Sequence, residues 1–337
     1  MQTAAREWLG TLDKYYLSEF INSGGAAFKL LLTREDRSAG VLDELQSLAE
    51  SKGYLYVLVS AAETRIDKID QIFFSIARSI DWERLVDRDA LQFLREHDYE
   101  VPEGVSPCDT AAIAEANGSD LEDLLKDIRR ATRQDIVQDR RMCKEFRTAI
   151  ARLRGARFFP RSVTPTDTET ISGWMRGEKV SAAALKDLGI YSKIGRHNAR
   201  EMLIALSHWL AKSLGTGLVI GLDLRALLTI RSSPPVGARS EIPPQQGQGM
   251  LHYSRSALLD AYEAIRQFID QTDDVTHCLI CAVAPEEIET DEKRSIFKYY
   301  ALQSRLLSEV HDVERQDLLA SMVRIGDARD EGMRDDE

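Results

Sequence analysis

An aspartate at the end of an apolar run is the first residue in this chain whose type and position could do chemistry. Residues 217–223 have the sequence Gly-Leu-Val-Ile-Gly-Leu-Asp. An apolar run of this length, flanked by glycine, predicts a buried parallel strand. A carboxylate at its carboxyl end would face the crevice where α/β sheets bind ligands. Asp223 could therefore hold Mg²⁺ beside a phosphate, or it could be a structural cap, because aspartate at a strand end also forms turns.

A phosphate site needs a second part, a glycine-rich loop that opens a helix. Such a loop supplies converging backbone N–H groups, a lysine for the β- and γ-phosphates, and a serine or threonine hydroxyl for Mg²⁺. The place for it is 33–41, where Thr33, Ser38 and Gly40 have suitable types but no lysine occurs. We expect this segment to lie beside Asp223, at neighbouring strand ends.

The residue after the aspartate is also unsuited to catalysis. ATP hydrolysis at such a site uses a side chain that orients the attacking water, and Leu224 stands in that position. Without the lysine and without this side chain, the chain should hydrolyse ATP poorly or not at all. The sequence therefore predicts no cofactor, with ATP and Mg²⁺ held at Thr33, Ser38, Gly40 and Asp223 as the alternative.

Apolar runs alternate with helical patterns through much of the chain, which predicts a doubly wound α/β fold. The expected strands are 26–33, 54–61, 217–223, 276–284 and 318–325. The first two, joined by a helix at 41–51, should form a βαβ unit with the strands paired in parallel.

Composition divides the chain into four segments. Residues 81–125 carry 13 acidic and 3 basic side chains, whereas 126–161 carry 12 basic and 4 acidic ones. A helical pattern continues through both halves, which predicts a helical insertion. The expected segments are 1–80 (helix and first βαβ unit), 81–160 (insertion), 161–326 (remainder of the sheet domain) and 327–337 (disordered acidic tail).

The basic half has two interpretations. Arginine is well suited to phosphate contacts, so a basic segment in a chain of net charge −11 could bind nucleic acid. It could equally pair with the acidic half. The candidate contacts are Arg129, Arg130, Arg133, Arg140, Arg141, Lys144 and Arg147.

The overall composition predicts a cytoplasmic protein with no membrane segment. No run of 18 apolar residues occurs, and the N-terminus lacks a signal-peptide core. Cys278 and Cys281 have metal-site spacing but lie inside an apolar run, so we interpret them as core thiols.

Several short stretches resemble one family, the BrxD-like, AAA+-related P-loop ATP-binding proteins of BREX-type phage-defence systems. The stretches are Tyr-Leu-Ser-Glu-Phe-Ile at 16–21, Trp-Met-Arg-Gly-Glu at 174–178, Asn-Ala-Arg-Glu-Met-Leu at 198–203, Gly-Leu-Val at 217–219, Tyr-Ser-Arg at 253–255, Ala-Ile-Arg-Gln-Phe-Ile-Asp at 264–270 and Leu-Leu-Ala-Ser-Met-Val-Arg at 318–324. The resemblance implies a P-loop NTPase-like sheet of the AAA+/ASCE type, five-stranded and mostly parallel.

Family members carry an intact phosphate loop and an Asp-Glu pair, and this chain departs from both. The resemblance therefore implies a catalytically degenerate subunit, structural or regulatory, of a bacterial anti-phage defence complex. Its implied partners are an active ATPase paralogue, a helicase or a DNA-modification enzyme, in an oligomer or hetero-complex. The alternatives are a weak or partner-completed ATPase and a DNA-binding adaptor that uses the basic segment.

Overall fold

The chain folds into two compact units, which we describe separately. The computed structural model describes residues 3–34, 40–228, 251–307 and 317–325. The sheet unit consists of the chain up to Lys68, Leu218–Asp274 and the segment from Cys278 onward. The helical unit consists of Ile69–Gly217 and Val275–His277. Within the described ranges, no helix has the length and apolar character needed to cross a bilayer.

The sheet unit is built on five parallel strands in the order β2-β3-β4-β1-β5. The α/β class and the parallel five-stranded sheet expected from the sequence are therefore confirmed. Its strands are β1 (Ala26–Thr33), β2 (Leu55–Ser60), β3 (Leu218–Asp223), β4 (Cys278–Pro285) and β5 (Met322–Ile325). The last strand is shorter than the expected 318–325.

The prediction that the first two strands pair was wrong. β1 and β2 are parallel, but β4 and β3 lie between them. Burial explains the order, because the side chains of β3 and β4 are almost entirely buried whereas Leu58 on β2 is 44% exposed. Continuous apolar strands belong in the interior of a sheet, and a strand with an exposed apolar residue fits an edge.

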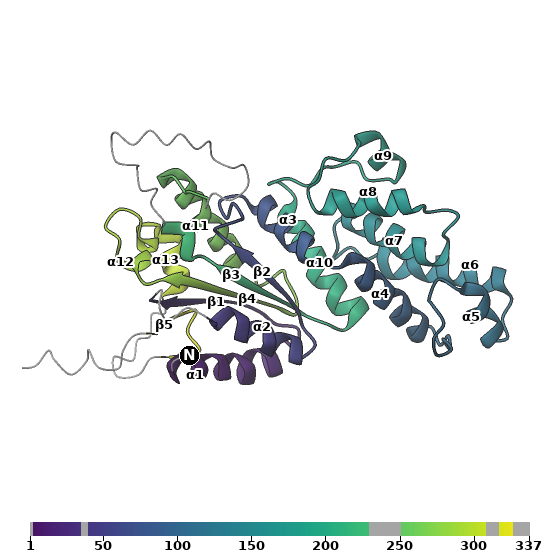
Figure 1. Cartoon of the computed structure of the whole chain (residues 1–337), viewed down its shortest axis with the longest axis horizontal. Helices are drawn as coiled ribbons and strands as arrows, with labels where there is room; N and C mark the ends of the chain where they lie inside the picture. The colour runs from purple at the N-terminus through teal and green to yellow at the C-terminus, as the bar shows by residue number, and fades with distance from the viewer. Residues whose placement is uncertain (1–2, 35–39, 229–250, 308–316, 326–337) are drawn as a thin grey trace, which may run out of the picture. The chain divides into compact units, whose positions relative to one another are not determined.

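Helices cover both faces of the sheet, as Figure 1 shows. One face packs against the N-terminal helices and α2, in a core that includes Trp8, Leu45, Leu279 and Cys281. The helix α11 packs against β1 and against α13. The helices of this unit are α1 (Thr3–Thr11), the π-helix η1 (Leu12–Phe20), α2 (Val41–Ser51), the 3₁₀ helix η4 (Arg225–Leu228), α11 (Arg255–Asp270), α12 (Glu287–Thr290), the 3₁₀ helix η5 (Ile296–Lys298) and α13 (Tyr300–Leu306).

The helical unit is larger than the insertion expected at 81–160. It also holds residues 161–217, which the sequence analysis assigned to the sheet domain, because α10 packs on α3, α4 and α7. The charge reversals that marked the expected boundaries describe the surface, whereas packing decides which helices share a core. The helices of the helical unit are α3 (Ile69–Ser79), α4 (Trp82–Glu96), α5 (Thr110–Ala116), α6 (Leu121–Thr132), the π-helix η3 (Arg133–Val137), α7 (Lys144–Phe158), α8 (Pro165–Met175), α9 (Ala182–Asp187) and α10 (Ala199–Leu214).

α8 and α9 are separate helices because the chain breaks at Gly177. This glycine has φ of 76°, and a Cβ there would come within 2.6 Å of the Phe74 ring. This left-handed conformation is strained for residues other than glycine and does not continue a right-handed helix. The helix α8 therefore ends just before Gly177. At the other end of α8, Thr164 and Asp167 form a capping box that starts the helix.

Candidate functional site

The expected nucleotide site falls at one edge of the sheet, where the carboxyl ends of the parallel strands meet. β1 and β3 both pair with β4, which places Thr33 beside Pro285 and Asp223 beside Val283. The two ends are thus one strand apart and not on neighbouring strands as expected. Two strand spacings and an offset of two residues separate them by roughly 12 Å. Ser38 lies outside the described residues.

The carboxylate of Asp223 is held by the arginine two residues later. The Arg225 guanidinium donates from Nε to Oδ1 at 2.8 Å and from a terminal nitrogen to Oδ2 at 2.8 Å. The Arg225 backbone N–H also donates to Oδ1, at 3.1 Å. Because both oxygens accept from one planar group, the charge that would attract Mg²⁺ is neutralised within the chain. The structure therefore pairs Asp223 with a cation of the same chain, the Arg225 guanidinium.

The position expected to orient the attacking water is part of the core. Leu224 is fully buried, and its backbone N–H donates to the carbonyl oxygen of Val283 at 2.8 Å. The side chain therefore points away from solvent at the strand ends, and it has no polar atom with which to hold water.

The described residues around the expected phosphate loop are also engaged elsewhere. Thr33 is buried, and its hydroxyl donates to the Arg34 carbonyl oxygen at 3.3 Å. Gly40 caps α2 with φ of 83°, a conformation that favours glycine. The first turn of α2 contains Asp43 and Glu44. These carboxylates interact with the positive end of the helix dipole and would repel a phosphate there.

Together these residues do not fit a bound ATP and Mg²⁺. The candidate metal ligand is in an ion pair, and the helix start carries two carboxylates. Arg34, the described arginine of the loop, is 3.4 Å from Glu286, the residue that follows β4. Among the described residues, no group of three or more histidine, cysteine, aspartate or glutamate side chains could hold a metal ion.

In the helical unit, part of the basic segment pairs with the acidic segment. Arg154 donates two hydrogen bonds to Asp89, at 2.6 and 2.7 Å, and both side chains are almost fully buried. Arg157 lies 2.6 Å from Asp87 and 3.5 Å from Glu83. These pairs join α7, which belongs to the basic segment, to α4, which belongs to the acidic segment.

The seven candidate nucleic-acid contacts lie between α6 and the start of α7. Some have partners: Arg130 pairs with Asp127, Arg141 with Asp139, and Arg147 donates to the Val137 carbonyl. Two others pack on aromatic rings, Arg129 on Phe159 and Lys144 on Tyr191. Arg133 and Arg140 are exposed.

A buried carboxylate within the basic segment was not singled out in the sequence analysis. The Asp139 side chain is 6% exposed and accepts hydrogen bonds from His208 at 3.0 Å and Lys212 at 2.9 Å. Burial opposes ionisation, but the hydrogen bonds from Lys212, the Arg141 backbone and His208 hold the Asp139 pKa well below its ordinary value. For His208, burial lowers the pKa more than the bond to Asp139 raises it. Since the partners are 69 and 73 residues apart, no local pattern could reveal them.

Comparisons with known proteins gave no relative for this chain. A scan against protein-family models, a search of curated proteins and a search of solved structures each returned no match.

Proposed function

We propose that this chain is a catalytically degenerate, P-loop-like subunit of a bacterial anti-phage defence complex. In this role it acts as a structural or regulatory partner of an active ATPase, a helicase or a DNA-processing enzyme. The P-loop-like part is supported by the five-stranded parallel sheet flanked by helices, an arrangement that fits a P-loop-like fold in general. The defence context is supported by the sequence resemblance.

The observation that carries the proposal is the Asp223–Arg225 pair. In a working site this carboxylate would hold Mg²⁺, whose charge stabilises the transferring phosphoryl group. Here both carboxylate oxygens lie 2.8 Å from a guanidinium nitrogen. Leu224, buried beside it, supplies no group for water. A parallel sheet whose edge carboxylate is neutralised by an arginine of the same chain fits assembly better than hydrolysis.

The test is phosphate release from Mg²⁺–ATP, measured for the chain alone and mixed with the products of neighbouring genes. We expect no release above buffer from the chain alone, and an unchanged rate when Asp223→Ala replaces the wild type in the mixture. If the chain alone released phosphate, or if the mixture lost activity with Asp223→Ala, the weak or partner-completed ATPase would replace this proposal.

A DNA-binding adaptor is the second candidate, and the exposed arginines of the basic segment favour it. Arg133 and Arg140 are solvent-exposed near Arg129 and Arg141 in the chain. Binding through phosphates weakens steeply with salt, because each contact releases counterions. A gel shift that weakens across a salt series and is reduced by Arg133→Gln with Arg140→Gln would support this candidate. A missing or salt-independent shift would remove it.

A further inference from the structure

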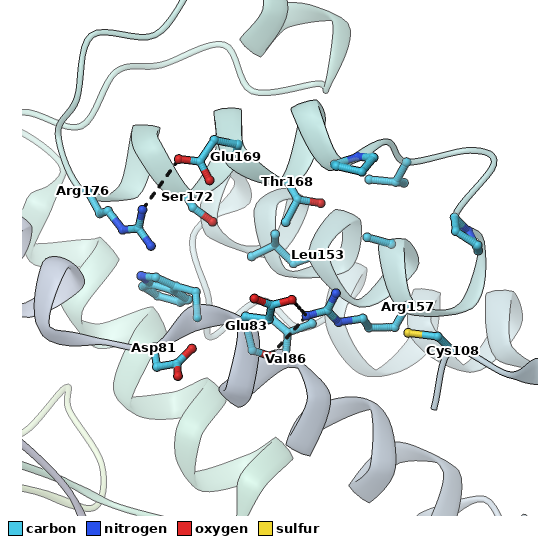
Figure 2. Close-up of a pocket in the computed structure, with 15 residues that line it drawn as sticks. Asp81, Glu83, Val86, Cys108, Leu153, Arg157, Thr168, Glu169, Ser172 and Arg176 are labelled. Carbon is cyan, nitrogen blue, oxygen red and sulfur yellow. Dashed lines mark hydrogen bonds and ion pairs between the residues drawn. The ribbon is translucent and has the colours of Figure 1, made fainter. Parts of the chain in front are cut away.

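The helical unit contains a cavity that no role considered so far uses. It has a volume of about 520 Å³ and lies among α4, α7, α8 and the loops beside them. Figure 2 shows the side chains that surround it. The lining residues are Asp81, Trp82, Glu83, Val86, Cys108, Leu153, Ala156, Arg157, Pro160, Val163, Pro165, Thr168, Glu169, Ser172 and Arg176.

Much of the cavity wall is apolar. Trp82, Val86 and Leu153 are buried core residues of α4 and α7, and Val163 is buried in the loop before α8. Apolar surface of this kind favours the burial of hydrocarbon or aromatic atoms. Cavities of about 300–1,000 Å³ with an apolar lining and a few polar groups are typical of small-molecule sites.

One polar part of the wall is a face of α8, and Asp81, Glu83 and Arg157 are charged residues elsewhere in the lining. Thr168, Ser172 and Arg176 are spaced by four residues, so they lie on the same side of this helix and its C-cap. Ser172 is only 5% exposed. Figure 2 shows its hydroxyl between Arg176 and Leu153. Two hydroxyls and a guanidinium thus stand in a row along one wall.

The two arginines of the lining differ in how firmly they are held. Arg157 lies 2.6 Å from Asp87 and is therefore engaged. Within the described part of the chain, the carboxylates that Arg176 contacts are at long distance, 3.9 Å to Glu169 and 4.0 Å to Glu178, and their side chains are 74% and 51% exposed. Exposed pairs at such distances contribute little. Arg176 can therefore exchange these contacts for a ligand anion.

We propose that this cavity binds a small organic anion with an apolar body. Its carboxylate or phosphate group would bind Arg176 beside Ser172 and Thr168, and its apolar body would lie against Trp82 and Leu153. A planar guanidinium offers paired donors that match either anionic group. The Glu169 carboxylate competes for Arg176 and moves into solvent when the ligand binds. This site does not depend on the proposed function of the sheet unit.

The test uses benzoate and phenyl phosphate as probes and benzyl alcohol as their neutral counterpart, with binding measured by calorimetry on the full chain. We expect at least one anion to bind and the alcohol to bind about tenfold more weakly or not at all, because it cannot pair with the guanidinium. The relative affinities of the two anions assign the natural ligand to the carboxylates or the phosphates.

Four variants locate the binding. Arg176→Gln should weaken it about tenfold or more, and Ala156→Phe should reduce it by filling the cavity. Glu169→Gln should strengthen it by removing the competing carboxylate, and because Glu169 is exposed this variant keeps the fold intact. Arg95→Gln, an exposed arginine of α4 outside the cavity lining, is the matched control and should bind as the wild type does.

Three results would overturn the proposal. They are absence of binding by both anions, equal binding of benzyl alcohol, and Arg176→Gln and Glu169→Gln variants that both bind as the wild type does. Circular dichroism of each variant verifies that a loss of binding is not a loss of fold.

Discussion

Removing one member of the buried Arg154–Asp89 pair should destabilise the helical unit strongly. Asp89 is fully buried and also accepts from the Trp209 indole N–H at 3.1 Å, and Arg154 packs over the Phe93 ring. Arg154→Met leaves a carboxylate in the core without its cation, which costs about 3–5 kcal/mol of unfolding free energy. Asp89→Leu leaves the guanidinium uncompensated and should cost a similar amount.

The double variant separates the charge effect from the loss of packing. With Arg154→Met and Asp89→Leu together, no unpaired charge remains, so the unfolding free energy should return to within about 2 kcal/mol of the wild type. The coupling energy of the cycle should then be about 3 kcal/mol or more. Arg130→Met is the matched control, because its pair with Asp127 is exposed and contributes about 0.5 kcal/mol or less.

Urea denaturation followed by tryptophan fluorescence measures these energies in the helical unit. Three of the four tryptophans lie there, and Trp82 and Trp209 stack with their ring centroids 6.3 Å apart. An Arg154→Met cost below about 1 kcal/mol would refute the reasoning. Additive costs in the double variant would refute it as well, because they would mean that the two charges do not interact.

Three further predictions concern single sites. Gly221→Ala should cost about 1–3 kcal/mol in urea denaturation, because the new Cβ would lie 2.2 Å from the Tyr56 hydroxyl; adding Tyr56→Phe should recover part of the loss, and no recovery would contradict the assigned clash. Tyr253→Phe should cost about 1–3 kcal/mol, since the hydroxyl accepts from the buried Ile66 N–H at 3.1 Å; a neutral effect would be inconsistent with that bond. In the folded state the pKa of His208 is below its ordinary value of 6.5, so the unfolded state binds more protons and the free energy of unfolding falls as the pH is lowered through that value. His208→Gln should flatten this part of the stability–pH curve, and an unchanged slope would exclude His208 as its source.

The sequence predicted the strands better than their arrangement. β3 and β4 are continuous apolar runs, and such runs are visible locally because both faces of an interior strand are buried. The order of the strands depends on which edges are left exposed. That is a property of the whole sheet, and the pairing expected for β1 and β2 was therefore wrong.

The candidate sites also differ in how far the sequence alone could reveal them. Asp223 and Arg225 are two residues apart, so their pairing was within reach of the sequence, yet an Asp-Leu-Arg triplet does not show which way its side chains point. The Asp89–Arg154 pair spans 65 residues, and the cavity beside Arg176 is formed by helices that are separate in the chain. Contacts of this kind follow from packing, and no local spacing encodes them.

Calorimetric titration of the chain with ATP in excess Mg²⁺ tests the central claim, that Arg225 takes the place of a metal ion on Asp223. We expect no saturable binding that responds to Asp223→Ala at ATP concentrations up to about 1 mM, the range in which a weak site would be detected. Micromolar binding, together with ATP turnover that Asp223→Ala abolishes, would contradict the account.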